Sequence, residues 1–191
     1  MPAEQLREAG FRTIGLYRNG WVSPTFGFEQ GFDTFFNVPR PEVVADDNLE
    51  RALLWLEQNH DRRFFFFLHM NDPHQPFNQP PPFDRKFNSV KDLRKFGAKL
   101  PLTIDTTGGV RGCKPCKKNG KLDPAFKQLG RDLYDGAVAY ADDRIGQFLD
   151  ALRERGVYDN TAIVFVSDHG EVMWDRNNYF GHGNVVEDPE S

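Results

Sequence analysis

The sequence predicts an α/β fold, a mostly parallel sheet flanked by helices. Two observations support this prediction. Helical and strand-like patterns alternate along the chain, and the strand-like runs at 63–70 and 161–166 each contain five consecutive apolar residues, as in strands buried on both faces. Right-handed crossovers would connect such parallel strands. At 191 residues the chain is most simply one domain with a sizeable core.

Each expected element has its own local signal. A short helix ends at Gly10, and a strand follows at Arg12–Tyr17. A second helix is expected at Ala45–Asn59, capped by Asp46 or Asp47. The strongest helical pattern, Leu129–Arg155, repeats apolar residues at three- and four-residue steps and stops at Gly156. Residues 19–37 read as a loop whose phenylalanine rings pack into the core: Phe26, Phe28, Phe32, Phe35 and Phe36.

Residues 83–128 show no clean period and are expected to form a basic insertion or lid with short helices. Between Asp84 and Lys127 there are 12 Lys and Arg against 4 Asp and Glu, although the whole chain has a net charge of -4. Such a block is usually a solvated surface, and it can attract an anionic substrate. Cys113 and Cys116 lie within it as a single C-x-x-C. Half of a zinc site, a small disulfide and two idle thiols all remain open.

Polar residues follow two of the expected strands. The run at 161–166 leads into Asp168 and His169. The run at 63–70 contains His69 near its end and leads toward Asp72 and His74. Ligands bind at the carboxyl ends of strands in open α/β sheets, so these side chains are expected at one rim. A carboxylate beside an imidazole is a plausible half of a divalent-metal site. The simpler alternative is a helix-capping aspartate and a solvated histidine.

A glycine-flanked histidine, His182, follows later in the chain and is free to reach a ligand or to remain solvated. With the other motifs, in this order and spacing, the chain resembles the sulfatase family of the alkaline-phosphatase-like superfamily. The matching segments are Glu4–Thr13, Gly27–Asp33, Phe66–His69, Asp72–Phe77, Tyr140–Gly146, Asp159–Thr161, Ser167–Glu171 and Gly181–Gly183.

This resemblance implies metal-dependent cleavage of a sulfate ester on a small molecule or a glycan. Asp168 and His169 match metal ligands of the family, with Ca²⁺ expected first and Mg²⁺ or Mn²⁺ as alternatives. His74 and His182 match catalytic, substrate-binding histidines. A transition state rich in negative charge needs such donors aimed at its oxygens. The family nucleophile is usually a formylglycine made from Cys or Ser in a C/S-x-P-x-R motif.

The sequence departs from the family at the nucleophile. The family places an acidic pair and the nucleophile motif before the helix that opens this sequence, and Cys113–Lys117 is only a misplaced look-alike. We therefore expect a partial sulfatase catalytic domain over residues 1–191, truncated at both ends, with no nucleophile and little activity alone.

Two other functions stay open: a phosphodiester or phosphonate-ester hydrolase or phosphoglycerol transferase of the same superfamily, and a non-catalytic anion-binding protein. Neither a nucleic-acid partner nor a membrane span is expected. No apolar run is longer than that of Phe64–Leu68, which is far shorter than the roughly 20 residues that a membrane-spanning helix needs.

Overall fold

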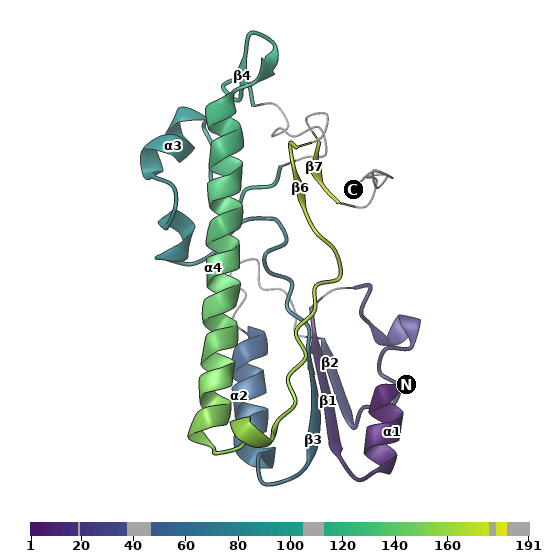
Figure 1. Cartoon of the computed structure of the whole chain (residues 1–191). Helices are drawn as coiled ribbons and strands as arrows, with labels where there is room; N and C mark the ends of the chain where they lie inside the picture. The colour runs from purple at the N-terminus through teal and green to yellow at the C-terminus, as the bar shows by residue number, and fades with distance from the viewer. Residues whose placement is uncertain (19, 38–46, 105–112, 176–178, 183–191) are drawn as a thin grey trace. The chain divides into compact units, whose positions relative to one another are not determined.

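The computed structural model describes residues 1–18, 20–37, 47–104, 113–175 and 179–182 (Figure 1). The chain divides into two compact units. Unit 1 consists of Met1–Asp72 and Ala139–Ala162, and unit 2 of Pro73–Val138 and Ile163–Ser191. Helix α4 (Pro124–Glu154) contributes its first part to unit 2 and its second part to unit 1. Within the described residues, no helix has both the length and the apolarity that crossing a membrane would require.

Unit 1 contains a three-stranded parallel sheet, which confirms the predicted fold class. Strand β1 (Arg12–Tyr17) lies between β2 (Thr34–Asn37) and β3 (Phe64–Leu68), and Ile14 is level with Thr34 and Phe66. Strands β1 and β3 were predicted. Strand β2 falls within the expected loop at 19–37 and was missed, because four residues carry too little pattern to identify a strand.

Side chains pack on both faces of this sheet, as expected for the continuously apolar strand β3. On one face Ile14 and Leu16 pack with Ala52 of helix α2 (Asp47–Asn59), and Phe148 of α4 joins this cluster. On the other face aromatic rings pack together: Tyr17, Phe32, Phe35, Phe65 and Phe67. The prediction that the loop rings are core is therefore right for Phe32 and Phe35. It is wrong for the exposed Phe26, Phe28 and Phe36.

The three predicted helices form. Helix α1 (Pro2–Glu8) precedes Gly10, whose φ of 84° suits the left-handed turn after a helix. Helix α2 begins at Asp47, so Ala45 and Asp46 of the predicted helix lie outside the described residues. Helix α4 begins at Pro124, before the predicted Leu129, and ends before Gly156.

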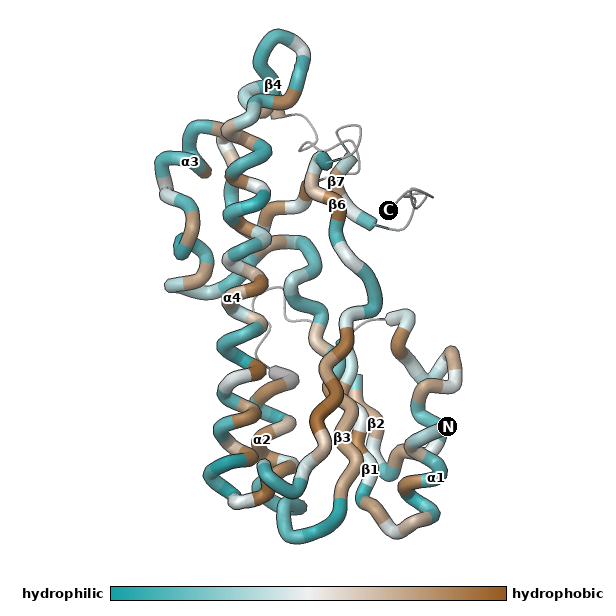
Figure 2. The backbone as a smooth tube through the Cα atoms, in the orientation of Figure 1, coloured by the Kyte–Doolittle hydropathy of each residue, from teal (hydrophilic) through white to brown (hydrophobic). Residues whose placement is uncertain are grey.

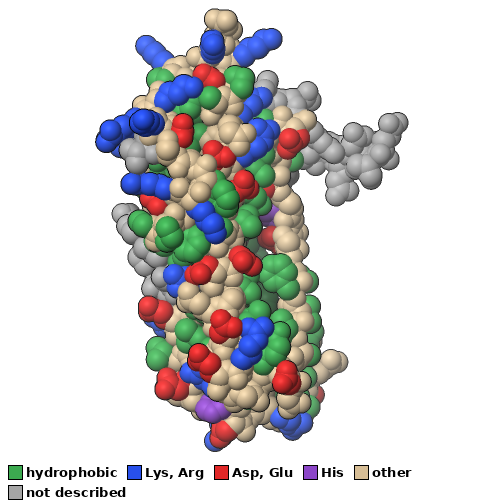
Figure 3. Space-filling view, turned by 60° about the vertical axis from the view of Figure 1, so that its left-hand side comes forward, with side chains coloured by type: hydrophobic (Ala, Val, Ile, Leu, Met, Phe, Trp, Pro, Cys, Tyr) green, Lys and Arg blue, Asp and Glu red, His purple; other side chains and the backbone are tan. Residues whose placement is uncertain are grey.

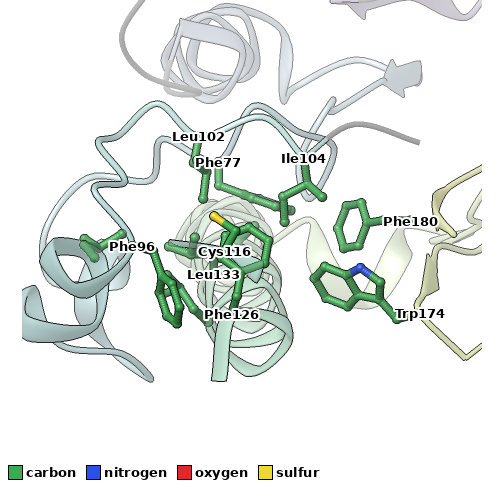
Figure 4. Close-up of a cluster of buried hydrophobic side chains, with 12 residues drawn as sticks. Phe77, Phe96, Leu102, Ile104, Cys116, Phe126, Leu133, Trp174 and Phe180 are labelled. Carbon is green, nitrogen blue, oxygen red and sulfur yellow. The ribbon is translucent and has the colours of Figure 1, made fainter. Parts of the chain in front are cut away.

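Unit 2 has a separate core, shown in Figure 4, that draws on distant parts of the chain. Phe77, Phe96, Phe126, Trp174 and Phe180 are all buried in it. The surrounding elements are short: the 3-10 helix η2 (Phe83–Arg85), helix α3 (Val90–Lys95), and strands β4 (Lys117–Lys118), β5 (Lys121–Leu122), β6 (Val172–Met173) and β7 (Phe180–Gly181). The short helices expected at 83–128 are thus present.

Cys113 and Cys116 form a disulfide with a Cα–Cα distance of 5.5 Å. Cys116 is buried in the core of unit 2. The zinc-module and idle-thiol interpretations are therefore wrong, because neither sulfur is a free thiol.

The strand predicted at 161–166 is not formed. The segment follows the 3-10 helix η3 (Tyr158–Asn160), pairs with no strand among the described residues, and is seen as a brown stretch of chain in Figure 2. Its apolar side chains are exposed, with Val164 at 83% and Phe165 at 77%. An apolar, β-branched run becomes a strand only where a neighbouring strand takes its backbone hydrogen bonds.

Candidate active site

Three imidazole rings meet in unit 2. The rings of His169 and His182 stack with their centroids 3.9 Å apart, and the ring of His74 meets His182 edge-on at 5.1 Å. His74 precedes the other two by more than 90 residues in the sequence. Folding therefore brings together three of the four residues to which the family resemblance assigned a role.

The β6–β7 hairpin places His182. Val172 lies opposite Gly181 and Met173 opposite Phe180, so Glu171 and His182 are the next pair along the ladder. His182 Nδ1 lies 3.2 Å from Glu171 Oε2, and the Tyr179 hydroxyl donates to the His182 carbonyl at 2.8 Å. The buried rings of Trp174 and Phe180 anchor this hairpin in the core of unit 2.

His74 is held by the residues that follow it. Its Nδ1 contacts the carbonyl of Gln75, and the Gln75 side chain accepts a hydrogen bond from the Ile104 amide at 2.8 Å. Phe77 is 1% exposed, exchanges two backbone hydrogen bonds with Leu102, and packs its ring edge-on against Phe180. His74 is therefore tied to the same core that supports the β6–β7 hairpin.

Glu171 is a site residue for which the sequence predicted no role. Its side chain is 11% exposed, and its Oε1 is buried without a hydrogen-bond partner within the described residues. Burial, followed by the negative charges of Glu171 and Asp135, raises the pKa of Tyr134. Glu171 ends a motif already noted for Asp168 and His169. Only the pairing of β6 with β7 sets it against His182.

Asp168 is the least engaged of the predicted site residues. Its side chain is 74% exposed, and its Oδ2 lies 3.6 Å from His169 Nε2. The two residues follow an exposed, unpaired segment, so their expected position at the carboxyl end of a sheet strand is wrong.

The structure supplies at most part of a metal site. In the described parts of the chain, no three His, Cys, Asp or Glu side chains are grouped to hold a metal ion. Asp168 and His169 offer two ligands, whereas Ca²⁺ takes roughly six to eight.

His69, Asp72 and Cys113 are the remaining residues that the sequence brought forward. His69 and Asp72 belong to unit 1, where the His69 amide donates to the Leu16 carbonyl at 2.8 Å and extends the pairing of β3 with β1. Cys113, the first residue of the nucleophile look-alike Cys113–Lys117, is bonded to Cys116 in the disulfide. The look-alike therefore offers no free thiol.

Comparison with known proteins identifies the family. A family model described as Sulfatase matches residues 3–191. The chain belongs to the sulfatase family. This sulfatase chain is 29% identical over 168 residues to an arylsulfatase of Clostridium perfringens, covering 86% of the chain and 32% of that relative. It is 28% identical over 165 residues to arylsulfatase K of Xenopus laevis, covering 75% of the chain and 30% of that relative.

A solved structure shares the fold. The phosphonate monoester hydrolase of Agrobacterium radiobacter superposes on 97% of this chain and 50% of its own, with a TM-score of 0.64 and 18% identity. This likeness confirms the predicted fold class. The sulfatase chain spans about a third of the length of the curated relatives named above.

Proposed function

We propose that this sulfatase chain takes part in the hydrolysis of sulfate esters and that its histidine cluster binds the sulfate group. The observation that supports the proposal is the meeting of His74, His169 and His182 in one place. Sulfate is an anion whose oxygens accept hydrogen bonds, and imidazoles present N–H donors near neutral pH. Clustered histidines without such a ligand would gain little from one another.

His74 and His182 are the proposed catalytic and substrate-binding residues. Each would donate to an ester or sulfate oxygen, and one would protonate the leaving oxygen as a general acid. Glu171 accepts from Nδ1 of His182, which leaves Nε2 for the substrate. Glu171 is thus a positioning residue.

Asp168 and His169 are proposed as two ligands of a divalent cation, Ca²⁺ first and Mg²⁺ or Mn²⁺ as alternatives. Such a cation, when bound, polarises sulfate oxygens. Its remaining ligands must come from outside the described residues. Calorimetric titration with Ca²⁺ and Mn²⁺ tests this assignment, since Asp168→Ala and His169→Ala should each abolish any binding that the unaltered chain shows. Equal binding by both variants would contradict it.

The attacking group is proposed to lie outside this chain. The sequence has no Cys or Ser in a C/S-x-P-x-R motif, and both cysteines are in the disulfide. The formylglycine typical of the family therefore has no site here. We expect little or no turnover of nitrophenyl sulfate with Ca²⁺, Mg²⁺ or Mn²⁺. Robust hydrolysis that disappears in Asp168→Ala would overturn this expectation.

Binding of phenyl sulfate tests the cluster without requiring turnover. His74→Gln and His182→Gln should each weaken binding about tenfold, the value of one charge-assisted hydrogen bond of roughly 1.4 kcal/mol. His60→Gln is the control, because His60 lies in unit 1 and its Nδ1 contacts the carbonyls of Leu56 and Glu57 at its own helix end. Equal affinity of all three variants for phenyl sulfate would contradict the proposal.

Phosphate and phosphonate esters remain the alternative substrates within the superfamily. The family match favours sulfate. Parallel titration with phenylphosphonate separates the two, since tighter binding of the phosphonate would favour the alternative.

A further inference from the structure

The lysines of this chain are confined to one region. All nine lie between Lys86 and Lys127, and the rest of the chain uses arginine alone for its fixed positive charge. Eight exposed cationic residues form what we call the basic end of unit 2, on α3, the loop after it and the β4–β5 hairpin: Lys91, Arg94, Lys95, Lys99, Lys114, Lys117, Lys118 and Lys121. Figure 3 shows Lys and Arg side chains gathered over these elements.

Buried contacts bring these elements together. Phe96, at the end of α3, is 3% exposed and packs edge-on against Phe126 at 5.4 Å. Cys113 Sγ lies 3.4 Å from the Phe96 carbonyl, and Cys116 is buried in the same cluster. The disulfide immediately precedes β4, so the hairpin is anchored at its base beside α3.

The β4–β5 hairpin places like charges opposite each other. Asn119 and Gly120 form the turn with φ values of 51° and 75°, which places Lys118 directly opposite Lys121. Like charges directly opposite each other in a ladder destabilise it. Among the described residues, none of the three hairpin lysines makes an ion pair.

Two carboxylates lie beside these cations, and both also accept hydrogen bonds from their own backbone segment. Asp92 Oδ2 accepts from the Ser89 amide at 2.9 Å and from its hydroxyl at 2.6 Å, capping α3. Asp123 Oδ1 accepts from the Ala125 amide at 2.8 Å. The eight cationic residues outnumber these two carboxylates, so the basic end keeps a net positive charge that can attract an anion from solution.

We propose that the basic end binds a sulfated polysaccharide, so that the substrate of this chain is a polymer rather than a small ester. This inference rests on the proposed function. Flexible lysines are point charges suited to irregularly spaced sulfate groups, whereas rigid bidentate recognition favours arginine. Single-stranded nucleic acids are held by exposed aromatic platforms among basic groups. Here Phe96 and Phe126 are buried, which favours the polysaccharide.

Heparin serves as the probe, with neutral dextran and a DNA duplex for comparison. The triple variant Lys117→Gln, Lys118→Gln, Lys121→Gln should weaken heparin binding at least tenfold and lower the salt dependence of log K by about two to three. Its thermal stability should stay the same or rise, because the repulsion between Lys118 and Lys121 is removed. The control removes the same charge from exposed sites of unit 1, Arg7→Gln, Arg51→Gln, Arg62→Gln, and should leave heparin affinity within about twofold.

Equal weakening by both triple variants would show a net-charge effect and overturn the proposal. DNA binding as tight as heparin binding would overturn it in favour of a nucleic-acid surface. The proposed function fails separately: phenyl sulfate binding should survive the lysine variant, and heparin binding should survive His182→Gln. If the lysine variant lost phenyl sulfate binding, the inference that the two ligands bind at separate surfaces would be contradicted.

Discussion

Three glycines of α4 offer a matched test of packing, because one helix carries them in different surroundings. A Cβ added at Gly146 would meet nothing within 4 Å. One added at Gly130 would lie 2.3 Å from Trp174 Cη2 and 2.9 Å from Ile104 Cδ1. At Gly136 it would lie 2.6 Å from the backbone carbonyl oxygen of Phe83. Local helix propensity is the same at all three, so any difference in outcome reports the neighbours.

Gly146→Ala should raise the free energy of unfolding by about 1 kcal/mol, the difference in helix propensity between the two residues. Gly130→Ala gains the same stability from helix propensity. It also forces the buried Trp174 ring to move, which should cost roughly 1–3 kcal/mol of stability. The net effect is a loss of up to about 2 kcal/mol. Gly136→Ala should lose more than Gly130→Ala, because a backbone oxygen yields less easily than a ring.

Urea unfolding followed by far-ultraviolet circular dichroism measures these changes, with tryptophan fluorescence as a second probe. Gly130→Ala should also weaken phenyl sulfate binding, because Trp174 anchors the hairpin that carries His182. Stabilisation of similar size by Gly146→Ala and Gly130→Ala would refute the packing described for Trp174.

Three further predictions concern other features. Reduction of the Cys113–Cys116 disulfide should lower the free energy of unfolding by about 2 kcal/mol, from the loop entropy of a sequence separation of 3; identical urea curves with and without reductant would contradict this. Tyr134 should ionise above the usual value of about pH 10, so its neutral form contributes stability that is lost as the pH rises further. Glu171→Gln should lower that pKa in an absorbance titration of tyrosinate, and an unmoved titration would argue against their proximity. Val164→Lys should reduce heat-induced light scattering and change stability by less than about 0.5 kcal/mol, because the side chain is already 83% exposed; scattering equal to that of the unaltered chain would count against an exposed apolar run.

Local patterns predicted the regular elements well. The predicted strand Arg12–Tyr17 coincides with β1, and the long apolar repeat of α4 was recognised because its period recurs over many turns. Strand β2 was missed because it is short and is defined by pairing with β1. The run at 161–166 shows the opposite error, since strand-like composition does not supply a partner strand.

Some site residues could likewise be predicted from the sequence, and others could not. His74, His169 and His182 were found from the residues around them, and the structure brings their rings together. Glu171 could be recognised only from its place in the ladder beside His182. The joining of α3 to the lysine hairpin also depends on contacts between distant residues, through Phe96, Phe126 and the disulfide.

The amino-acid sequence by itself determined the helices, the two longer strands, the sulfatase family and the histidines, because each leaves a periodic or motif signal within a few residues. The tertiary structure alone decided which histidines meet, that a buried carboxylate supports one of them, and that the lysines share one end of unit 2. These are outcomes of packing between segments far apart in the chain, and hydrophobic burial carries no local sequence signal of which distant partner it will select.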